Sequence, residues 1–487
     1  MKYRVNSTIK VFKNVMLTAT LACLSMSCVS NAKSEKTTTE KPNFIIILTD
    51  DQGYADVGFN GSDDIITPNI DRIANEGTKF SNGYVTYAVC GPSRAGILTG
   101  RYQGRFGFGR NPIIDPTDEN SGMPLEEQMI SEVLKPVGYT SSIIGKWHMG
   151  THEKFRPNKR GFDHFYGFLS GGHKYFPSDL TIDKIENAKK DWSWYNTKIM
   201  ENNKRVEIDE YLTDELSHEA INFIEREQDN PFFLYLAYNA PHTPLQASKE
   251  YLDRNTHIKD KKRRTYAAMV TAVDDGVGRI LAKLDEFGID DNTMIFFLSD
   301  NGGAKNKGSD NGELRGFKGG YFEGGVHVPF AVRWPGKVPA GVNYQNPVSS
   351  LDILGTFAGI TKAPIAQERP LDGVNLMPFI TGKEKGVPHD VLFWRAFDQG
   401  TLATRRGNSK AIQSDRDGNH LFDLANDLAE QNNLITESSV KENNVQYQQL
   451  TEEIKAWETE LIDPIFKPLQ GRHVDSRKRK KNKDTNK

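Results

Sequence analysis

Acidic side chains follow two apolar runs of the sequence, at the point where each run ends. Asp50 and Asp51 come directly after a run at residues 43–49, and Asp300 and Asn301 follow a later run. Three carboxylates and an amide oxygen are hard ligands of the kind that Ca²⁺ or Mg²⁺ takes. Carboxylates brought close together repel one another unless a cation lies between them. The residues therefore predict a site for Ca²⁺ or Mg²⁺, although either pair alone would also fit a turn.

Basic and imidazole side chains occupy comparable positions after two other apolar runs. Lys146 and His148 follow the run at 142–144, and His242 follows the run at 232–238. A histidine can transfer a proton near neutral pH, and a lysine can neutralise developing negative charge. Taken singly, each histidine is equally consistent with a hydrogen-bonded loop residue.

The apolar runs predict strands that are buried on both faces, because their apolarity is continuous rather than alternating. Between them, apolar residues recur every three or four positions over 212–224 and 266–284, which predicts amphipathic helices. Strands that alternate with such helices predict an α/β sandwich, with a large, mostly parallel central sheet flanked by helices. Ligands of such folds bind beyond the carboxyl ends of the strands, where the polar residues fall. Asp274 and Asp275 lie inside the second helix and are interpreted as structural.

Length and composition set the domain organisation. The chain has 487 residues, of which 37% are hydrophobic and 26% charged, and this excludes a disordered, fibrous or polytopic membrane protein. A net charge of −2 gives no preference for nucleic acid, and no nucleic-acid partner is expected. Residues 42–382 are expected to form the catalytic domain. Shorter strand-like runs and one more helix then predict a small C-terminal α+β subdomain over 383–467, followed by a basic, disordered tail over 468–487.

The N-terminal residues predict export. Basic residues precede an apolar run that is too short to span a bilayer. Residues 1–32 are expected to be a signal peptide, followed by a polar linker over 33–41. Alternatively, the signal ends at residue 27 and Cys28 carries a lipid anchor, as in bacterial lipoproteins. The protein is expected in the periplasm, or else as an outer-membrane lipoprotein or a secreted protein, without a transmembrane span.

Cys90 is the one cysteine that lies outside the predicted signal, so it has no partner for an internal disulfide. It opens the sequence Cys-Gly-Pro-Ser-Arg-Ala-Gly-Ile-Leu-Thr-Gly-Arg. This segment resembles the signature of type I sulfatases, C-x-P-S-R followed by A-x-x-L-T-G-R, at every fixed position. The resemblance extends to the strand ends described above, to 316–320 with Lys318, and to 421–434. The chain thus resembles the formylglycine-dependent sulfatases of the alkaline-phosphatase-like superfamily, and among them bacterial polysaccharide sulfatases.

The resemblance implies a chemistry and a role for each residue. A formylglycine-generating maturation enzyme would convert Cys90 to Cα-formylglycine, whose hydrated aldehyde is the nucleophile. His148 would handle the proton of that hydrate, and His242 would protonate the leaving oxygen. Three cations would neutralise charge on the sulfuryl oxygens: Arg94, Lys146 and Lys318. The implied metal is Ca²⁺, with Mg²⁺ as the alternative, and its implied ligands are the four strand-end residues and the modified cysteine: Asp50, Asp51, Cys90, Asp300 and Asn301.

The expected function is the hydrolysis of sulfate esters on a sulfated polysaccharide or its oligosaccharides, such as ulvan, carrageenan or fucoidan. One alternative is a phosphoester or phosphonate hydrolase of the same superfamily. Those enzymes generally have a Ser or Thr nucleophile or a second metal, so Cys90 and the two lysines favour sulfate. The other alternative is a catalytically silent protein that binds sulfated glycans.

Overall fold

The structure, a computed structural model, describes residues 41–188, 192–435 and 444–468. From Lys41 onward the chain forms one compact unit. The predicted signal peptide with Cys28, nearly all of the linker and the basic tail from residue 469 lie outside the described residues. Among the helices that the structure describes, none is long and apolar enough to cross a membrane.

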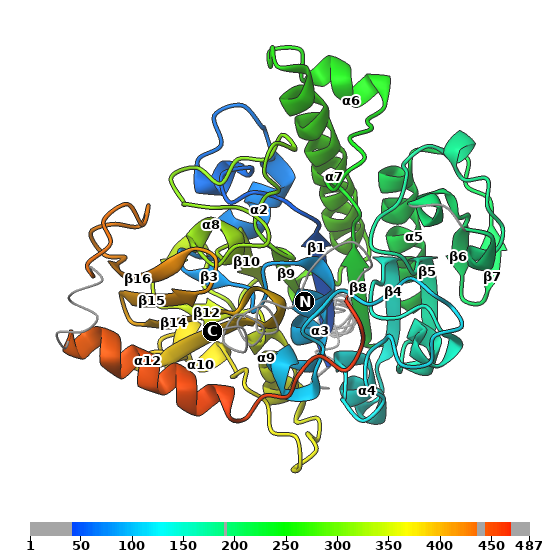
Figure 1. The fold of residues 1–487 in the computed structure, drawn as a ribbon. Helices are drawn as coiled ribbons and strands as arrows, with labels where there is room; N and C mark the ends of the chain where they lie inside the picture. The colour runs from blue at the N-terminus through cyan, green and yellow to red at the C-terminus, as the bar shows by residue number, and fades with distance from the viewer. Residues whose placement is uncertain (1–40, 189–191, 436–443, 469–487) are drawn as a thin grey trace, which may run out of the picture. The chain divides into compact units, whose positions relative to one another are not determined.

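A ten-stranded mixed sheet forms the centre of this unit (Figure 1). Five neighbouring strands in its middle (β9, β1, β8, β4 and β5) run parallel, whereas antiparallel pairs join β10 to both of its neighbours and β6 to β5 and β7. In spatial order the strands are β11 (Val342–Tyr344), β2 (Thr78–Phe80), β10 (Phe330–Arg333), β9 (Thr293–Ser299), β1 (Asn43–Thr49), β8 (Phe232–Ala237), β4 (Thr140–Lys146), β5 (His164–Phe168), β6 (Ile199–Glu201) and β7 (Lys204–Val206).

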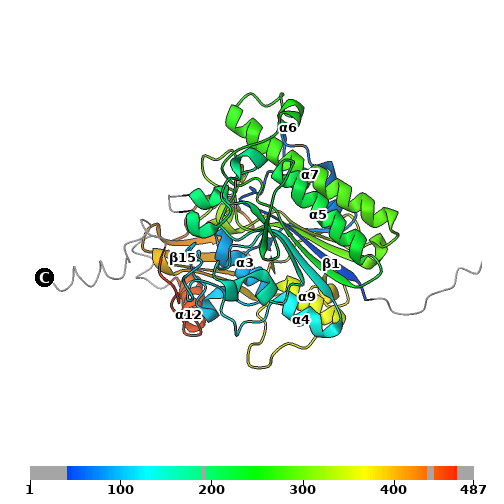
Figure 2. The same ribbon diagram turned by 90° about the vertical axis from the view of Figure 1, so that its right-hand side faces the viewer.

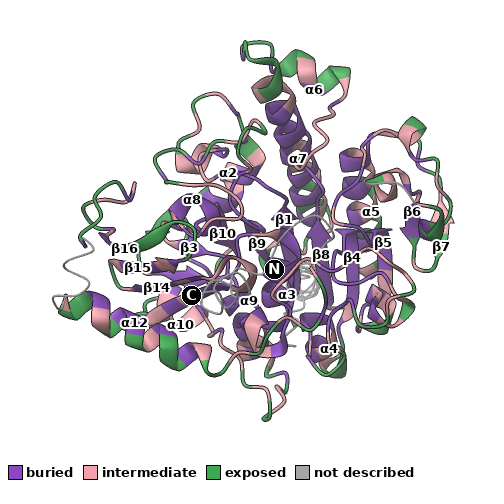
Figure 3. Cartoon of the chain, viewed as in Figure 1, coloured by how far each residue is buried: buried purple, intermediate pink, exposed green. Residues whose placement is uncertain are grey.

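Helices cover both faces of this sheet (Figure 2). Successive residues of β1 explain why, because Ile45 and Ile47 belong to one hydrophobic core and Phe44, Ile46 and Leu48 to the other. The first core is closed by α2 (Pro68–Asn75), α5 (Leu212–Glu227) and α7 (Lys261–Glu286). The second is closed by α3 (Cys90–Thr99), α4 (Ile130–Leu134) and α9 (Asp352–Thr361). The five parallel strands between the two layers are buried along almost their whole length (Figure 3).

A small antiparallel sheet follows in the C-terminal part. Its strands are β13 (Val391–Ala396), β14 (Thr401–Arg406), β15 (Ser409–Ser414) and β16 (Gly418–Asp423), and α12 (Val445–Glu458) packs against it. Leu392 and Trp394 of β13 join the core that contains α3, and the Trp394 indole donates to the carbonyl of Val85 at 2.8 Å. The small sheet therefore shares a core with the large one, and the domain boundary at 382 stays a prediction. The remaining elements are β3 (Gly83–Tyr84) paired with β12 (Val348–Ser349), and the short helices α6 (Lys249–Arg254), α8 (Glu323–Val326) and α10 (Met377–Ile380).

The predicted fold class is confirmed. The expected strand at 43–49 coincides with β1, and the expected helix at 266–284 lies inside α7. Antiparallel pairs occur toward both edges of the sheet, although the edge strand β11 pairs with β2 in parallel. The sequence did not reveal the antiparallel pairs because strands of three or four residues are too short for a recognisable apolar run. The two acids inside α7 are structural: Asp274 accepts from the backbone N–H groups of Asn69 and Ile70 at the start of α2, and Asp275 pairs with Arg254.

Candidate active site

The parallel arrangement of the middle strands brings the polar strand ends to one edge of the sheet. Asp50 and Asp51 follow β1, and Asp300 and Asn301 follow β9. Lys146 is the last residue of β4, with His148 two residues later, and His242 lies in the turn after β8. Cys90 reaches the same edge from the first turn of α3.

The twelve-residue segment that begins at Cys90 consists of α3, its C-cap Gly100 and the following Arg101. Every residue of this helix is buried, and its N-terminal N–H groups favour an anion near Cys90. Gly100 ends the helix with a φ of 62°, a left-handed conformation that glycine adopts without strain. Arg101 then pairs with both carboxylate oxygens of Glu127, at 2.6 and 2.7 Å. Part of the segment therefore builds the helix and its ends, while Cys90 and Arg94 face the strand ends.

Four potential ligands gather closely at this edge. One atom from each of Asp50, Asp51, Cys90 and His242 lies within 4.8 Å of the others. Next to them, Asn301 donates through Nδ2 to Asp51 at 2.8 Å, while its buried Oδ1 has no hydrogen-bond partner among the described residues. An orphaned buried oxygen beside carboxylates fits a hard divalent cation.

Cations already accompany the carboxylates, contrary to the argument from repulsion that the sequence suggested. Arg94 is fully buried and its Nη2 lies 2.8 Å from Asp300, and Lys146, also fully buried, lies 2.5 Å from Asp50. The Nζ of Lys318 lies 2.5 Å from Asp51. Because three cations offset three carboxylates, support for a metal rests on the oxygen donors and the orphaned Asn301 oxygen, not on unpaired charge.

The Cys90 thiol lies in the middle of this arrangement. Its Sγ is 3.4 Å from Oδ1 of Asp50 and 3.1 Å from Nζ of Lys318. Burial and the negative charge of Asp50 raise the pKa of the thiol to about 12. An unmodified Cys90 is therefore protonated at neutral pH and is a poor nucleophile, since the thiolate is the reactive form.

The two histidines differ in their surroundings. Nδ1 of His242 lies 2.6 Å from the carbonyl of Thr243, so it must donate there, which leaves Nε2, 3.7 Å from Asp51, as the site that gains or loses a proton. Burial lowers the pKa of His242 to about 3 and, together with Lys146, holds that of His148 well below its usual value. Both imidazoles are therefore neutral here. The Nδ1 of His148 is buried with no hydrogen-bond partner among the described residues.

Two site residues have strained backbones. Asp51 and His148 have φ angles of 64° and 57°, a left-handed conformation that costs a non-glycine residue about 1–3 kcal/mol and clusters at functional sites. The structure must hold both side chains in place against this cost.

Sequence reasoning missed several neighbours of the site. Gly171 lies against His148, and a Cβ at this position would come within 2.6 Å of the imidazole Nε2. The ring of Tyr195 lies 6.4 Å from that of His242. A signal for Gly171 existed, since Ser-Gly-Gly follows β5 at the same edge of the sheet, but no local pattern indicated Tyr195.

A buried charge cluster supports the loop that carries Lys318. Lys410 of β15 lies 2.7 Å from Glu323 and 2.9 Å from Glu430, and all three side chains are fully buried. Glu430 also accepts from the backbone N–H of Glu323 at 2.6 Å, and its carbonyl accepts from Arg315. Lys410 of the C-terminal sheet and Glu430, which follows that sheet, thereby hold both ends of the segment that contains Lys318.

Comparison with known proteins identifies the family. The sequence model of the family named Sulfatase matches residues 42–363. The chain belongs to the sulfatase family. It is 33% identical over 414 residues to the uncharacterized sulfatase YdeN of Escherichia coli (strain K12), which covers 74% of this chain and 70% of that protein. It is 37% identical over 353 residues to the N-acetylgalactosamine-6-sulfatase of Homo sapiens, which covers 70% of this chain and 66% of the human protein.

Solved structures give the same result. The crystal structure of Ps i-CgsB is 42% identical with a TM-score of 0.81, over 87% of this chain and 94% of that chain. A second structure, of Ps i-CgsB in complex with k-i-k-neocarrahexaose, is 40% identical with a TM-score of 0.82, over 92% and 98% of the two chains. The resemblance to sulfatases of the alkaline-phosphatase-like superfamily is confirmed, and the relatives support a sulfuric ester hydrolase. Sulfatases generally use a formylglycine and a divalent metal, and this chain has a group of residues that could bind one.

Proposed function

We propose that this sulfatase hydrolyses sulfate esters on a sulfated polysaccharide or its oligosaccharides, with Cys90 converted to formylglycine and Ca²⁺ at the acidic strand ends. The position of Cys90 carries the proposal. Its Sγ lies between a carboxylate and an ammonium group at the N-terminus of a buried helix, yet as a thiol it would be protonated. Conversion of Cys90 to formylglycine would place an oxygen nucleophile beside the cationic side chains that can bind a sulfate group.

The nucleophile and the metal each supply one part of the chemistry. Formylglycine supplies, as its hydrate, an oxygen that attacks sulfur and can release the sulfate again. The ion would be held by oxygen donors from Asp50, Asp51, Asp300 and Asn301 and supplies positive charge toward the sulfate. Mg²⁺ is the alternative ion.

The cations of the chain bind and orient the substrate anion. Lys318 reaches both Asp51 and Cys90, so its ammonium lies where a sulfate on the nucleophile would be. Although burial opposes it, the carboxylate of Asp51 raises the pKa of Lys318 well above its usual value, which keeps the group charged. Lys146 and Arg94 add two buried positive charges. Fixed charges in a dry site stabilise the negative charge that develops on the sulfuryl oxygens.

The histidines are assigned the proton transfers. His148 lies next to the start of the helix that carries Cys90, because a Cβ at Gly91 would lie 3.2 Å from the backbone carbonyl oxygen of His148. His148 would take the proton of the formylglycine hydrate. His242 would protonate the leaving oxygen through Nε2, because Nδ1 is held by the Thr243 carbonyl. The negative charge of bound sulfate favours the protonated form that this role requires.

The proposed substrate class rests on the solved relatives. Ps i-CgsB, the structure with 42% identity, has also been solved with a neocarrahexaose. Carrageenan oligosaccharides are therefore the first candidates, ahead of ulvan and fucoidan. We also propose that the protein is exported to the periplasm, with a lipid anchor at Cys28 or secretion as alternatives, and that it is matured by a formylglycine-generating enzyme. The basic residues and apolar run of the N-terminus support export.

The test begins with the Cys90 peptide from protein made in its own host. Conversion to formylglycine lowers the mass of this peptide by about 18 Da. Sulfate release is then measured on carrageenan, ulvan, fucoidan and glycosaminoglycan fragments, with matching phosphate esters as a comparison. Cys90→Ala should abolish sulfate release, and Cys90→Ser should be nearly as damaging when the host matures only cysteine. An unmodified peptide with full activity, or faster release of phosphate than sulfate, would refute the proposal.

A further inference from the structure

The last described segment of the chain, residues 461–468, runs from α12 toward α3 (Figure 1). We call it the C-terminal strap. It is bonded to the loop that follows α3, because the backbone N–H of Ile462 donates to the carbonyl of Gly104 at 3.0 Å and that of Ile465 to the carbonyl of Gly107 at 3.1 Å. These bonds join parts of the chain that are more than 350 positions apart.

Side-chain contacts also fix the strap in place. The rings of Phe108 and Phe466 lie 5.1 Å apart, and Nη1 of Arg110 donates to the carbonyl of Phe466 at 2.8 Å. Gly107 allows the close approach, since a Cβ there would lie 2.6 Å from Cγ2 of Ile465. The direction in which the chain continues beyond the strap is therefore set by the folded protein.

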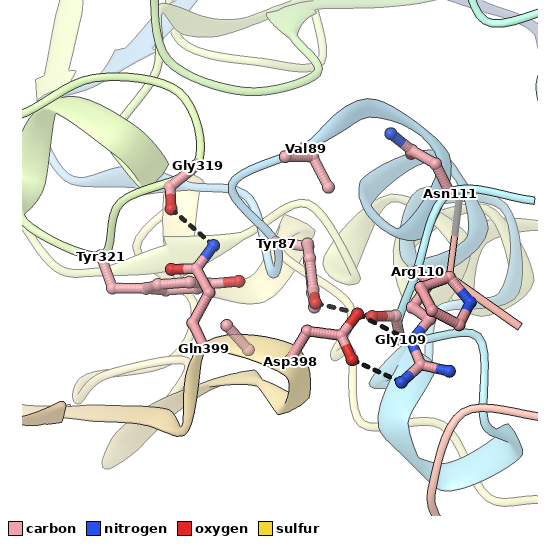
Figure 4. Close-up of a pocket in the computed structure, with 11 residues that line it drawn as sticks. Tyr87, Val89, Gly109, Arg110, Asn111, Gly319, Tyr321, Asp398 and Gln399 are labelled. Atoms are coloured by element: carbon pink, nitrogen blue, oxygen red, sulfur yellow. Dashed lines mark hydrogen bonds and ion pairs between the residues drawn. The ribbon is translucent and has the colours of Figure 1, made fainter. Parts of the chain in front are cut away.

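The strap ends beside the catalytic centre. Pro468, its last residue, lines a small cavity together with Val89 and Gly319. Figure 4 shows these last two residues, of which Val89 precedes Cys90 and Gly319 follows Lys318. Whatever follows Pro468 in the chain is therefore attached next to the residues proposed to bind the sulfate group.

The residues that follow are strongly basic. Residues 469–487 contain eight basic and two acidic side chains, a net charge of +6, and five of the basic ones are consecutive at 477–481. Subtracting this from the net charge of −2 for the whole chain leaves −8 for residues 1–468. A fully extended chain spans at most about 3.6 Å per residue, so the basic run lies within about 47 Å of Pro468.

The folded part of the chain offers little free positive charge at this place. Arg110 is the one cation among the described residues that line the cavity, and it is bonded to both carboxylate oxygens of Asp398 (Figure 4). The cations of the site also face carboxylates. A sulfated polysaccharide carries many negative charges and is repelled by a body of net negative charge. Attraction for it must come from the basic residues beyond the strap.

We propose that residues 469–487 bind the sulfated polysaccharide outside the catalytic centre and so concentrate it at Cys90; the proposal rests on the proposed function. The partner is recognised by its density of negative charge, because Lys and Arg that neutralise a polyanion release its counterions whatever its sequence. Since these residues are tethered beside the site, binding of one part of a long chain makes binding of another part at Cys90 intramolecular.

The experiment uses two variants of the full chain with equal net charge. The tail variant replaces the five basic residues of 477–481 by Gln. The body variant is the matched control and replaces five exposed lysines by Gln: Lys204, Lys249, Lys337, Lys383 and Lys385. Steady-state kinetics are measured on the sulfated polysaccharide that the parent desulfates fastest, carrageenan first, on k-i-k-neocarrahexaose and on 4-nitrophenyl sulfate. The salt is NaCl at about 0.01 M and about 1 M, where charges are screened over about 30 Å and 3 Å.

The tail variant should raise KM on the polymer about tenfold or more at low salt and leave kcat within about twofold, because electrostatic attraction acts before the chemical step. The effect should be smaller on the hexasaccharide and below about twofold on the aryl sulfate. At about 1 M NaCl parent and variant should agree. The body variant should change KM much less, although its net charge is the same.

Binding is measured separately, without turnover, on immobilised carrageenan and on phosphatidylglycerol vesicles. Cys90→Ala versions of the parent and both variants are used, and only the tail variant should lose affinity for the polysaccharide.

The inference would be overturned by unchanged binding and KM of the tail variant, by equal effects of the two variants, or by an equal loss on the aryl sulfate. Loss of vesicle binding alone would assign the tail to a lipid surface instead. A parent that releases no sulfate from any substrate would refute the proposed function, and the binding of the Cys90→Ala proteins would then decide this inference by itself.

Discussion

Replacement of Lys410 by methionine should destabilise the protein strongly at pH 8 and much less at pH 5.5. The Lys410 ammonium is fully buried and lies 2.7 Å from Glu323 and 2.9 Å from Glu430, which are fully buried as well. Methionine fills a similar volume but leaves two buried carboxyl groups without their cation. Removal of one partner from a buried ion pair typically costs about 3–5 kcal/mol.

The pH dependence follows from the two carboxyl groups. Burial raises the pKa of Glu430 to about 7 even in the presence of Lys410, and the charge of Lys410 holds the pKa of Glu323 below its usual value against burial. Loss of that charge raises the folded-state pKa of both groups. When the pKa of a carboxyl group is higher in the folded than in the unfolded protein, the free energy of unfolding is highest below the unfolded pKa of 4.5. That stability is lost as the pH rises from there through the folded pKa, because the folded protein then also has to ionise the group. The loss of stability of Lys410→Met relative to the parent should therefore grow from pH 5.5 to pH 8.

Thermal unfolding followed by far-UV circular dichroism measures the effect. The unfolding entropy of a chain of this length is about 1 kcal/mol per kelvin, so the loss corresponds to a fall in Tm of about 3–5 °C at pH 8. Lys283→Met is the matched control, because Lys283 pairs with Glu286 at the surface, where such pairs contribute about 0–1 kcal/mol. Combining Lys410→Met with Glu430→Gln should recover part of the loss at pH 8. The reasoning would be refuted if Lys410→Met lowered Tm equally at pH 5.5 and pH 8, or lowered it no more than the control Lys283→Met does.

Three further predictions concern the site. Asn301→Ala should abolish the rise in Tm that Ca²⁺ produces in the parent, because the orphaned Oδ1 is lost. The control Asp275→Asn on the surface of α7 should keep this rise. Differential scanning calorimetry with Ca²⁺ and with a chelator measures the Tm of both variants. His242→Ala should slow release from a sulfated sugar by about 10²–10⁴-fold and from an aryl sulfate much less, because only the sugar alkoxide needs an acid. Gly171→Ala should lower kcat on both substrates, because the new Cβ would lie 2.6 Å from Nε2 of His148 and displace that imidazole. Steady-state kinetics on a sulfated sugar and an aryl sulfate measure the predictions for His242 and Gly171.

Other outcomes would contradict these predictions. A Ca²⁺-dependent rise in Tm that persists in Asn301→Ala would remove this residue from the metal site. Equal losses of His242→Ala on the two substrates would show that its role is not to protonate the leaving oxygen. Full activity of Gly171→Ala would mean that the position of His148 tolerates displacement.

Much of the central fold is readable from local patterns. Strands such as β1 and β9 are buried on both faces, so their sequences are apolar throughout and stop where the chain reaches the edge of the sheet. The stripe of apolar residues on α7 is equally plain because the helix covers one face. Strands of three residues next to the edge strands, such as β2 and β6, carry too few side chains for a pattern, and their pairing depends on the partner strand.

The residues of the site were predictable by type and by strand end, but their partners were not. The sequence indicated Arg94, Lys146 and Lys318 as cations for a substrate, and it did not show that each already faces a carboxylate. It placed His242 at the leaving oxygen, and it did not show that this imidazole lies beside Asp51. Such pairings join residues separated by tens to hundreds of positions, so only the tertiary packing of the parallel strands, α3 and the loop of Lys318 decides them.

By itself the sequence determined the nucleophile segment at Cys90, the acidic strand ends and the family, because these depend on residue types at short spacing. The contact of Gln399 with Gly319 and the Lys410 cluster were decided by the tertiary structure alone. Each combines the large sheet's loops with the small sheet, as where Gln399 reaches Gly319 and Lys410 reaches Glu323. A contact of this kind depends on how two separately formed sheets pack through a common core, and no local spacing in the chain encodes that packing.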